Sequence, residues 1–177
     1  MVVRRWSVVL IVVVLFTTPR AARAQQQSEI CNPVMPTNID AGLLAPDMAA
    51  LLRRSDTFRS QCARVAAARV RVKLEVVNGL DNGRAQTAIH RYPSGALRAD
   101  VWILFGENYR ELLPHEFEHI LEQIEGVNLR AEAAQGRAWV LQGGAFETRR
   151  AFEAGVQVLR ELEALHAPAP VAVHATR

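Results

Sequence analysis

Between residues 70 and 105 the apolar residues recur at every second position, which is the period of a β-strand rather than that of a helix. The alternation is clearest at 70–76, where valine and leucine alternate with arginine, lysine and glutamate. Two links with turn-forming residues divide the block into three candidate strands, at 70–76, 84–92 and 97–105. Short links of this kind join antiparallel neighbours, so we predict a three-stranded antiparallel sheet.

The segments on either side of this block have a helical period. Ser55 or Asp56 is a suitable N-cap at the boundary between two helices that precede the strands. We predict helices at residues 46–54, 55–68, 112–123 and about 145–166, and a short strand at 138–141. The sequence therefore predicts an α+β fold, in which N-terminal helices and a short antiparallel three-stranded sheet precede another helix and a long C-terminal helix.

The first residues have the layout of a secretory signal peptide. Two arginines precede an apolar run at 6–16, and the small-residue sequence Ala22-Arg23-Ala24 follows it. The apolar run is shorter than the roughly 20 residues of a membrane-spanning helix. We therefore predict a signal peptide at 1–24, cleaved after Ala24, and a periplasmic or secreted protein. The chain would meet a membrane only if this segment stays uncleaved.

The rest of the chain has the length of one domain. We predict a single domain at residues 25–166 and a flexible alanine- and proline-rich tail at 167–177. The full chain has 21 basic and 18 acidic residues, but the leader takes four arginines and no acidic residue with it. The 17 basic and 18 acidic residues that remain form no basic patch, so we expect no nucleic-acid partner.

Two cysteines, Cys31 and Cys62, lie beyond the leader. In an oxidising compartment two such cysteines usually pair, so we predict a disulfide between them. In the chain-entropy model a bridge that closes a loop of this size contributes about 3–4 kcal/mol to stability. A metal site built on thiols is the alternative, but the sequence lacks the Cys-x-x-Cys spacing that such sites usually have.

The segment His115-Glu116-Phe117-Glu118-His119 lies on a predicted helix. Residues four apart project from the same helix face, so His115 and His119 could bind one metal ion with Zn–N distances of about 2.0–2.1 Å. A zinc ion lowers the pKa of a bound water to about 7, and Glu116 would lie close enough to accept a proton from it. The pattern therefore predicts a site for one Zn²⁺ ion with Glu116 as general base.

A site with two histidines needs a third ligand, and two glutamates compete for this role. Glu147 falls on the apolar stripe of the predicted C-terminal helix, where a carboxylate is costly unless it is paired or bound to a metal. Glu122 follows His119 by three residues on the same helix face. We favour Glu147, because a ligand from a second helix closes the coordination sphere from a new direction.

These residues resemble the zincin metallopeptidases, and among them the gluzincins, in the form of a small exported bacterial-type member. The resemblance is carried by His115-Glu116-x-x-His119 and by the downstream Glu147, and it covers about residues 97–155. It implies zinc bound by His115, His119 and Glu147, and hydrolysis of a peptide or protein substrate in which a metal-bound water attacks the carbonyl and Glu116 is the general base. The strand before the helix could pair with an extended substrate.

Two other classes of function remain open. The first is a catalytically inactive metal-binding or interaction domain stabilised by the disulfide. The second is a di-metal carboxylate protein, because Glu116-x-x-His119 matches half of such a site. The second class requires another Glu-x-x-His motif beside the first to complete the site, and we favour this class least.

Overall fold

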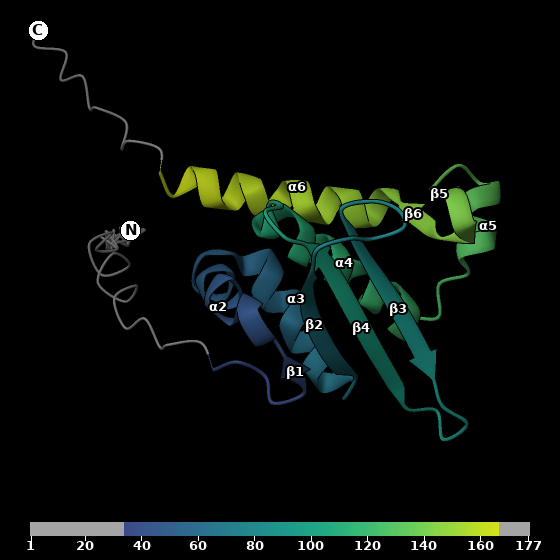
Figure 1. Cartoon of the computed structure of the whole chain (residues 1–177), viewed down its shortest axis with the longest axis horizontal. Coiled ribbons are helices and arrows are strands. Elements are labelled where there is room, and N and C mark those ends of the chain that lie inside the picture. Colours follow the sequence, from purple (N-terminus) through teal and green to yellow (C-terminus); the bar gives the residue numbers. More distant parts are fainter. Residues whose placement is uncertain (1–33, 167–177) are drawn as a thin grey trace, which may run out of the picture. The chain divides into compact units, whose positions relative to one another are not determined.

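The computed structural model describes residues 34–166 (Figure 1). The predicted signal peptide at 1–24, Cys31 and the tail at 167–177 lie outside the described residues. The elements follow one another as β1 (Ile39–Asp40), η1 (Gly42–Leu44), α2 (Ala45–Arg54), α3 (Asp56–Ala67), β2 (Arg71–Val77), β3 (Ala85–Arg91), β4 (Leu97–Leu104), α4 (Tyr109–Ile124), α5 (Leu129–Ala134), β5 (Ala138–Val140), η2 (Gln142–Gly144), β6 (Phe146–Thr148) and α6 (Arg149–Ala164).

The fold is α+β, as predicted, and the two N-terminal helices lie where the sequence places them. Ser55 separates α2 from α3 and caps α3, because its hydroxyl oxygen accepts a hydrogen bond of 3.0 Å from the backbone N–H of Phe58. The predicted short strand at 138–141 is also present, as β5, which pairs with β6 in a separate two-stranded sheet.

The predicted three-stranded antiparallel sheet is wrong in its topology. The sheet has four strands in the order β1-β2-β4-β3, and β2 pairs in parallel with β4, whereas β3 pairs antiparallel with β4. Strand β4 therefore lies between β2 and β3. The physical reason is burial: β4 contributes Ala99, Val101 and Ile103 to the core, whereas β3 has no fully buried residue. The more apolar strand takes the interior position and β3 forms an edge.

The helices α2, α3 and α4 share one core with the sheet. The aromatic rings of Phe58 on α3 and Phe117 on α4 lie near its centre, with centroids 5.2 Å apart and planes tilted by 57°. Phe117 lies between the two histidines in sequence. The helix that contributes this ring to the core therefore also carries the candidate site. Burial of this ring orients the opposite side of α4 toward the cleft described below.

The helix α6 lies along α4 (Figure 1). Its buried residues are Ala151, Gly155, Val158 and Leu162. The sequence predicts these four on the inward stripe together with Ala154 and Leu165, of which Ala154 is only partly buried and Leu165 is exposed. At Gly155 the two backbones approach closely, since a Cβ atom there would lie 2.9 Å from the carbonyl oxygen of Glu111. Glycine at this position sets the distance between the two helices.

The start of this last helix differs from the prediction. The helix begins at Arg149 rather than at about Ala145, and Thr148 is its N-cap, accepting a hydrogen bond of 3.0 Å from the N–H of Ala151. Glu147 therefore lies on β6, one residue before the cap, and not on the helix. Pairing of β6 with β5 explains the change, because the backbone before the cap is extended and forms ladder hydrogen bonds.

Within residues 34–166 no helix combines the length and the apolar character that crossing a membrane requires. Cys62 is buried in the core, and burial raises the pKa of its thiol to about 12. Its predicted partner, Cys31, lies outside the described residues, so the disulfide stays a prediction.

Replacing Gly155 by alanine tests the close contact between α4 and α6. Alanine favours a helix by about 1 kcal/mol over glycine. Overpacking against a backbone atom that cannot rotate away costs about 1–3 kcal/mol. We expect Gly155→Ala to lower the free energy of unfolding by about 1 kcal/mol in urea denaturation. The exposed Arg160→Ala on the same helix should change it by less than about 0.5 kcal/mol. A more stable Gly155→Ala protein would contradict the close approach.

A second prediction concerns Glu161, which joins α6 to the first turn of α3. Burial raises the pKa of this carboxyl, but hydrogen bonds from Ser55 (2.5 Å) and Thr57 (2.5 Å and 3.2 Å) outweigh it and hold the pKa below its ordinary value of 4.5. A depressed folded-state pKa stabilises the protein above the unfolded-state pKa, and this contribution is lost as the pH falls through the folded-state pKa. We expect Glu161→Gln to cost about 1–2 kcal/mol at neutral pH.

The difference between Glu161→Gln and the unmodified protein should shrink between neutral pH and an acidic pH below the folded-state pKa of the carboxyl, where the carboxyl is protonated. Urea denaturation at both pH values measures this, with the exposed Glu163→Gln as control. An equal difference at both pH values would show that the carboxylate charge is irrelevant.

Candidate metal centre

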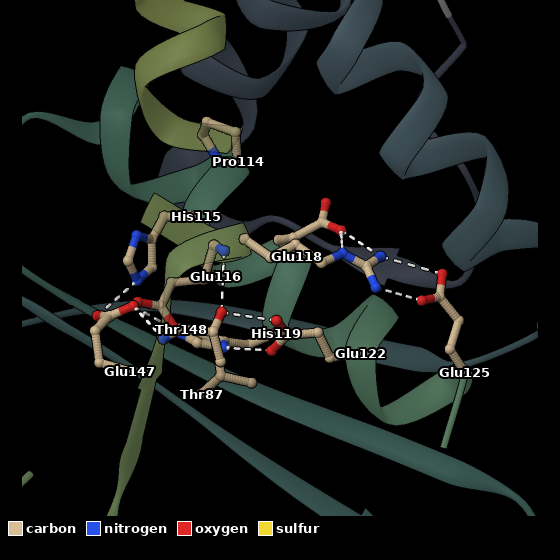
Figure 2. A network of polar contacts seen from close by, with 12 residues as sticks. Thr87, Pro114, His115, Glu116, Glu118, His119, Glu122, Glu125, Glu147 and Thr148 are labelled. Atoms are coloured by element: carbon tan, nitrogen blue, oxygen red, sulfur yellow. Dashed lines mark hydrogen bonds and ion pairs between the residues drawn. The ribbon is translucent and has the colours of Figure 1, made fainter. Parts of the chain in front are cut away.

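His115 and His119 lie one turn apart on α4, with ring centroids 5.0 Å apart and planes at 77° (Figure 2). Both rings are mostly shielded, because the side chains of His115 and His119 are 14% and 15% exposed. The helical spacing predicted from the sequence therefore places the two imidazoles side by side in a position that is largely shielded from solvent.

Glu147 reaches these two rings from β6. One carboxylate oxygen lies 3.1 Å from Nε2 of His115, and the other lies 3.8 Å from Nε2 of His119. One donor atom from each of the three residues lies within 4.8 Å of the other two. The structure thus brings the three predicted metal ligands together, with Glu147 approaching from a strand rather than from a second helix.

Glu122 takes a different position from Glu147. It is 2% exposed and contacts Nδ1 of His119 at 3.0 Å, on the far side of the ring from Glu147. Its other oxygen accepts a hydrogen bond of 2.7 Å from the hydroxyl of Thr148. Glu122 and Glu147 therefore contact different nitrogens of the His119 ring, Glu122 at Nδ1 and Glu147 at Nε2.

Glu116 lies beside the two histidines and faces strand β3. It is 3% exposed, and one of its oxygens accepts a hydrogen bond of 2.6 Å from the hydroxyl of Thr87. Burial raises the pKa of Glu116 above its ordinary value, while His119, His115 and the Thr87 hydroxyl oppose this rise. A carboxyl with a raised pKa beside two imidazoles is a suitable group for accepting and releasing a proton.

The charges around the two rings favour a cation. Burial lowers the pKa of His119, but the hydrogen bond with Glu122 and the neighbouring carboxylates reverse this effect and leave the pKa raised. Burial raises the pKa of Glu147, but the hydrogen bond and charge of His115 reverse it and leave the pKa lowered. Metal binding displaces protons from such groups, so a divalent cation would replace the proton that the His119 ring attracts.

A cleft of about 680 Å³ opens over the two histidines and Glu116. One wall is the edge strand β3, and the other is the hairpin that carries Glu147, so the candidate ligands lie between the two. The cleft is lined by polar and apolar side chains together, among them Gln86, Thr87, Ile89, Leu112, Leu141 and Phe146. A volume of this size is within the range of sites that take small molecules or peptide segments.

The donor set fits zinc. Two imidazole nitrogens and one carboxylate oxygen form a His₂Glu set, which in catalytic sites leaves the fourth position of a tetrahedron open. Tetrahedral bonds of 2.0–2.1 Å place neighbouring donor atoms about 3.3 Å apart. The contacts of 3.1 Å and 3.8 Å between Glu147 and the two rings lie on either side of this value. The three donor atoms lie within 4.8 Å of one another, so movements of the side chains alone could bring them to this spacing.

Glu118, the second glutamate of the motif, contacts an arginine of α6. It is buried, and its oxygens accept hydrogen bonds of 2.5 Å from Arg150 and 2.6 Å from Gln61 (Figure 2). Gln61 also donates a hydrogen bond of 2.9 Å to the carbonyl of Pro114. The polar side of α4 is thus held to α3 and α6 directly behind the histidines.

Sequence reasoning missed the two threonines of the site. The sequence did contain a signal for Thr148, because threonine is a preferred N-cap residue. Recognising this N-cap would have moved the predicted helix start to Arg149. Thr87 had none, since its contact with Glu116 depends on where β3 lies relative to α4. No family model, curated protein or solved structure matches this chain. What the chain binds therefore has to be argued from the geometry of its own residues.

Metal content tests the centre directly. We expect about one zinc ion per chain by elemental mass spectrometry after dialysis, and a higher unfolding temperature with zinc, since saturation at 100 times Kd adds about 2.7 kcal/mol of stability. Glu147→Ala should weaken zinc binding by more than the roughly 10–100-fold typical of an outer-shell partner. Glu153→Ala, an exposed glutamate on α6, should have no effect. Stoichiometric zinc in Glu147→Ala would remove this residue from the ligand set.

Proposed function

We propose that this chain is a zinc-dependent, metallopeptidase-like hydrolase that acts on a peptide or protein substrate. The observation that carries the proposal is the convergence of His115, His119 and Glu147 within 4.8 Å, with Glu116 beside them in the same cleft. His115, His119 and Glu147 would hold the ion. When bound, a zinc ion supplies Lewis-acid chemistry, which polarises a carbonyl oxygen and acidifies water.

The proton chemistry belongs to Glu116. Its carboxylate lines the cleft, so it is positioned to accept a proton from a water molecule and to pass it to the leaving nitrogen. Thr87 donates a hydrogen bond to one carboxylate oxygen, which leaves the other oxygen for this transfer. The surrounding burial excludes bulk water and makes each charge interaction stronger than it would be in solution.

The edge strand β3 supports an extended polypeptide as substrate. In the described sheet β3 pairs with β4 on one side only, and residues of β3 line the cleft. An extended segment could add to this edge through backbone hydrogen bonds, which depend little on side-chain identity. Apolar side chains on the opposite wall, such as Leu141 and Phe146, would then contact the side chains of that segment.

A second candidate is a metal-binding or interaction domain without turnover. The specific observation in its favour is the burial of Glu116, which is 3% exposed and hydrogen-bonded to Thr87. In this alternative Glu116 is a structural residue that tethers α4 to β3. For either candidate, export rests on the leader at residues 1–24, and stabilisation by the Cys31–Cys62 disulfide rests on the cysteine content.

Glu116→Gln separates the two candidates. The amide keeps the size and the Thr87 contact but cannot accept a proton, so we expect normal zinc content and hydrolysis slowed by about 10²–10⁴-fold. The measurement is cleavage of a fluorogenic peptide library by the purified protein, with chelation and zinc restoration beside it. Glu153→Gln is the matched surface control. Zinc binding without cleavage in the unmodified protein would favour the second candidate.

A further inference from the structure

Two residues behind the candidate ligands form a chain of hydrogen bonds. Nδ1 of His119 contacts Glu122 at 3.0 Å, Glu122 accepts from the Thr148 hydroxyl at 2.7 Å, and that hydroxyl accepts from the N–H of Ala151 at 3.0 Å. Glu122 is 2% exposed, and both of its oxygens have protein partners. A buried carboxylate with both oxygens partnered is held in one rotamer.

We infer that Glu122 and Thr148 are positioning residues, which together hold His119 and Glu147 in the arrangement that binds a metal. The inference rests on the zinc site proposed above, and it names residues that determine how tightly that site binds. Neither side chain contacts the candidate metal position. Each acts through the ligand next to it.

Two hydrogen bonds of the chain have a determined direction. The Thr148 oxygen accepts the N–H of Ala151, so its single proton is directed at Glu122. The other oxygen of Glu122 faces Nδ1 of His119, where it can accept a hydrogen bond and hold a ring proton on Nδ1. With a proton held on Nδ1, Nε2 is the nitrogen available to a metal. An outer-shell carboxylate of this kind fixes the tautomer and orientation of a ligating histidine.

Thr148 also positions Glu147. Its backbone N–H donates a hydrogen bond of 2.8 Å to one oxygen of the Glu147 carboxylate. One residue therefore contacts Glu147 through its backbone and Glu122 through its side chain (Figure 2). A shift of Thr148 would move both ligands together, and this predicts that Glu122 and Thr148 act as one unit in metal binding.

The test is a double-mutant cycle on zinc affinity, measured by competition with a chromophoric chelator. The variants are Glu122→Gln, Thr148→Val and the combination of both. In Glu122→Gln the amide cannot accept on both atoms, so either the His119 tautomer reverses or the Thr148 hydroxyl loses its acceptor. In Thr148→Val the shape is kept and the hydroxyl is lost.

Two further variants separate this role from helix capping. Thr148→Ser keeps the hydroxyl and should restore the affinity. Asn128→Ala removes the N-cap of α5, where the side chain accepts from the N–H of Ala131 at 3.1 Å with no link to the ligands. Circular dichroism checks that each protein is folded, and the visible spectrum of bound Co²⁺ reports the coordination geometry independently of activity.

We expect Glu122→Gln to raise the zinc Kd by about 10–100-fold and Thr148→Val by about 10-fold. The zinc Kd of the double variant should exceed that of Glu122→Gln alone by no more than about twofold, because the two residues belong to one unit. Thr148→Ser and Asn128→Ala should stay within about twofold of the unmodified protein. The Co²⁺ spectrum should change in both single variants at the site and in neither control.

Four results would overturn the inference. Additive effects of Glu122→Gln and Thr148→Val would show that the residues act separately. An equal loss in Asn128→Ala and Thr148→Val would assign the effect to helix capping. Unchanged affinity in Glu122→Gln would remove Glu122 from the site while leaving the proposed hydrolase intact, if the unmodified protein binds zinc and cleaves peptides. An unmodified protein that binds no zinc would overturn the inference and the proposed function together.

Discussion

Three glutamates of a single helix, α4, are buried, and the arrangement around this helix depends on how their charges are compensated. A buried carboxylate is costly unless hydrogen bonds or opposite charges satisfy it. Glu116 is satisfied from β3, Glu118 from α3 and α6, and Glu122 from His119 and the residue that caps α6. Each neighbour of α4 therefore contributes a specific partner, and none can slide along the helix without leaving a charge exposed to an apolar surface.

The local parts of this arrangement follow from the sequence. Helix boundaries at α2 and α3, the strand positions, and the pairing of His115 with His119 on one helix face all depend on residues a few positions apart. The strand order does not, because the position of β4 between β2 and β3 is decided by which strand has the most apolar surface to bury against the helices. The period of the apolar residues identifies strands, but it does not determine their order in the sheet.

The candidate site was predictable to a similar extent. Helical counting placed Glu147 on an inward face of α6, yet the residue reaches the histidines from β6. Its role as the third ligand stays a prediction. The partners of Glu118, Gln61 and Arg150, are 57 and 32 residues away in sequence. Contacts between residues so far apart in sequence arise from tertiary packing, and no local sequence pattern predicts them.

The separation of the candidate ligands along the chain also has a consequence for resistance to proteolysis. Between α4 and β6 the chain passes through α5, which buries no residue, and β5, which buries only Ala138. Few core contacts hold this segment, so it belongs to the part of the fold that opens most readily. An ion that joins α4 to Glu147 would close this segment into a loop and suppress its opening. The first cut by a foreign protease would then fall here in metal-starved molecules, and the metal supply of the compartment would regulate the lifetime of the protein.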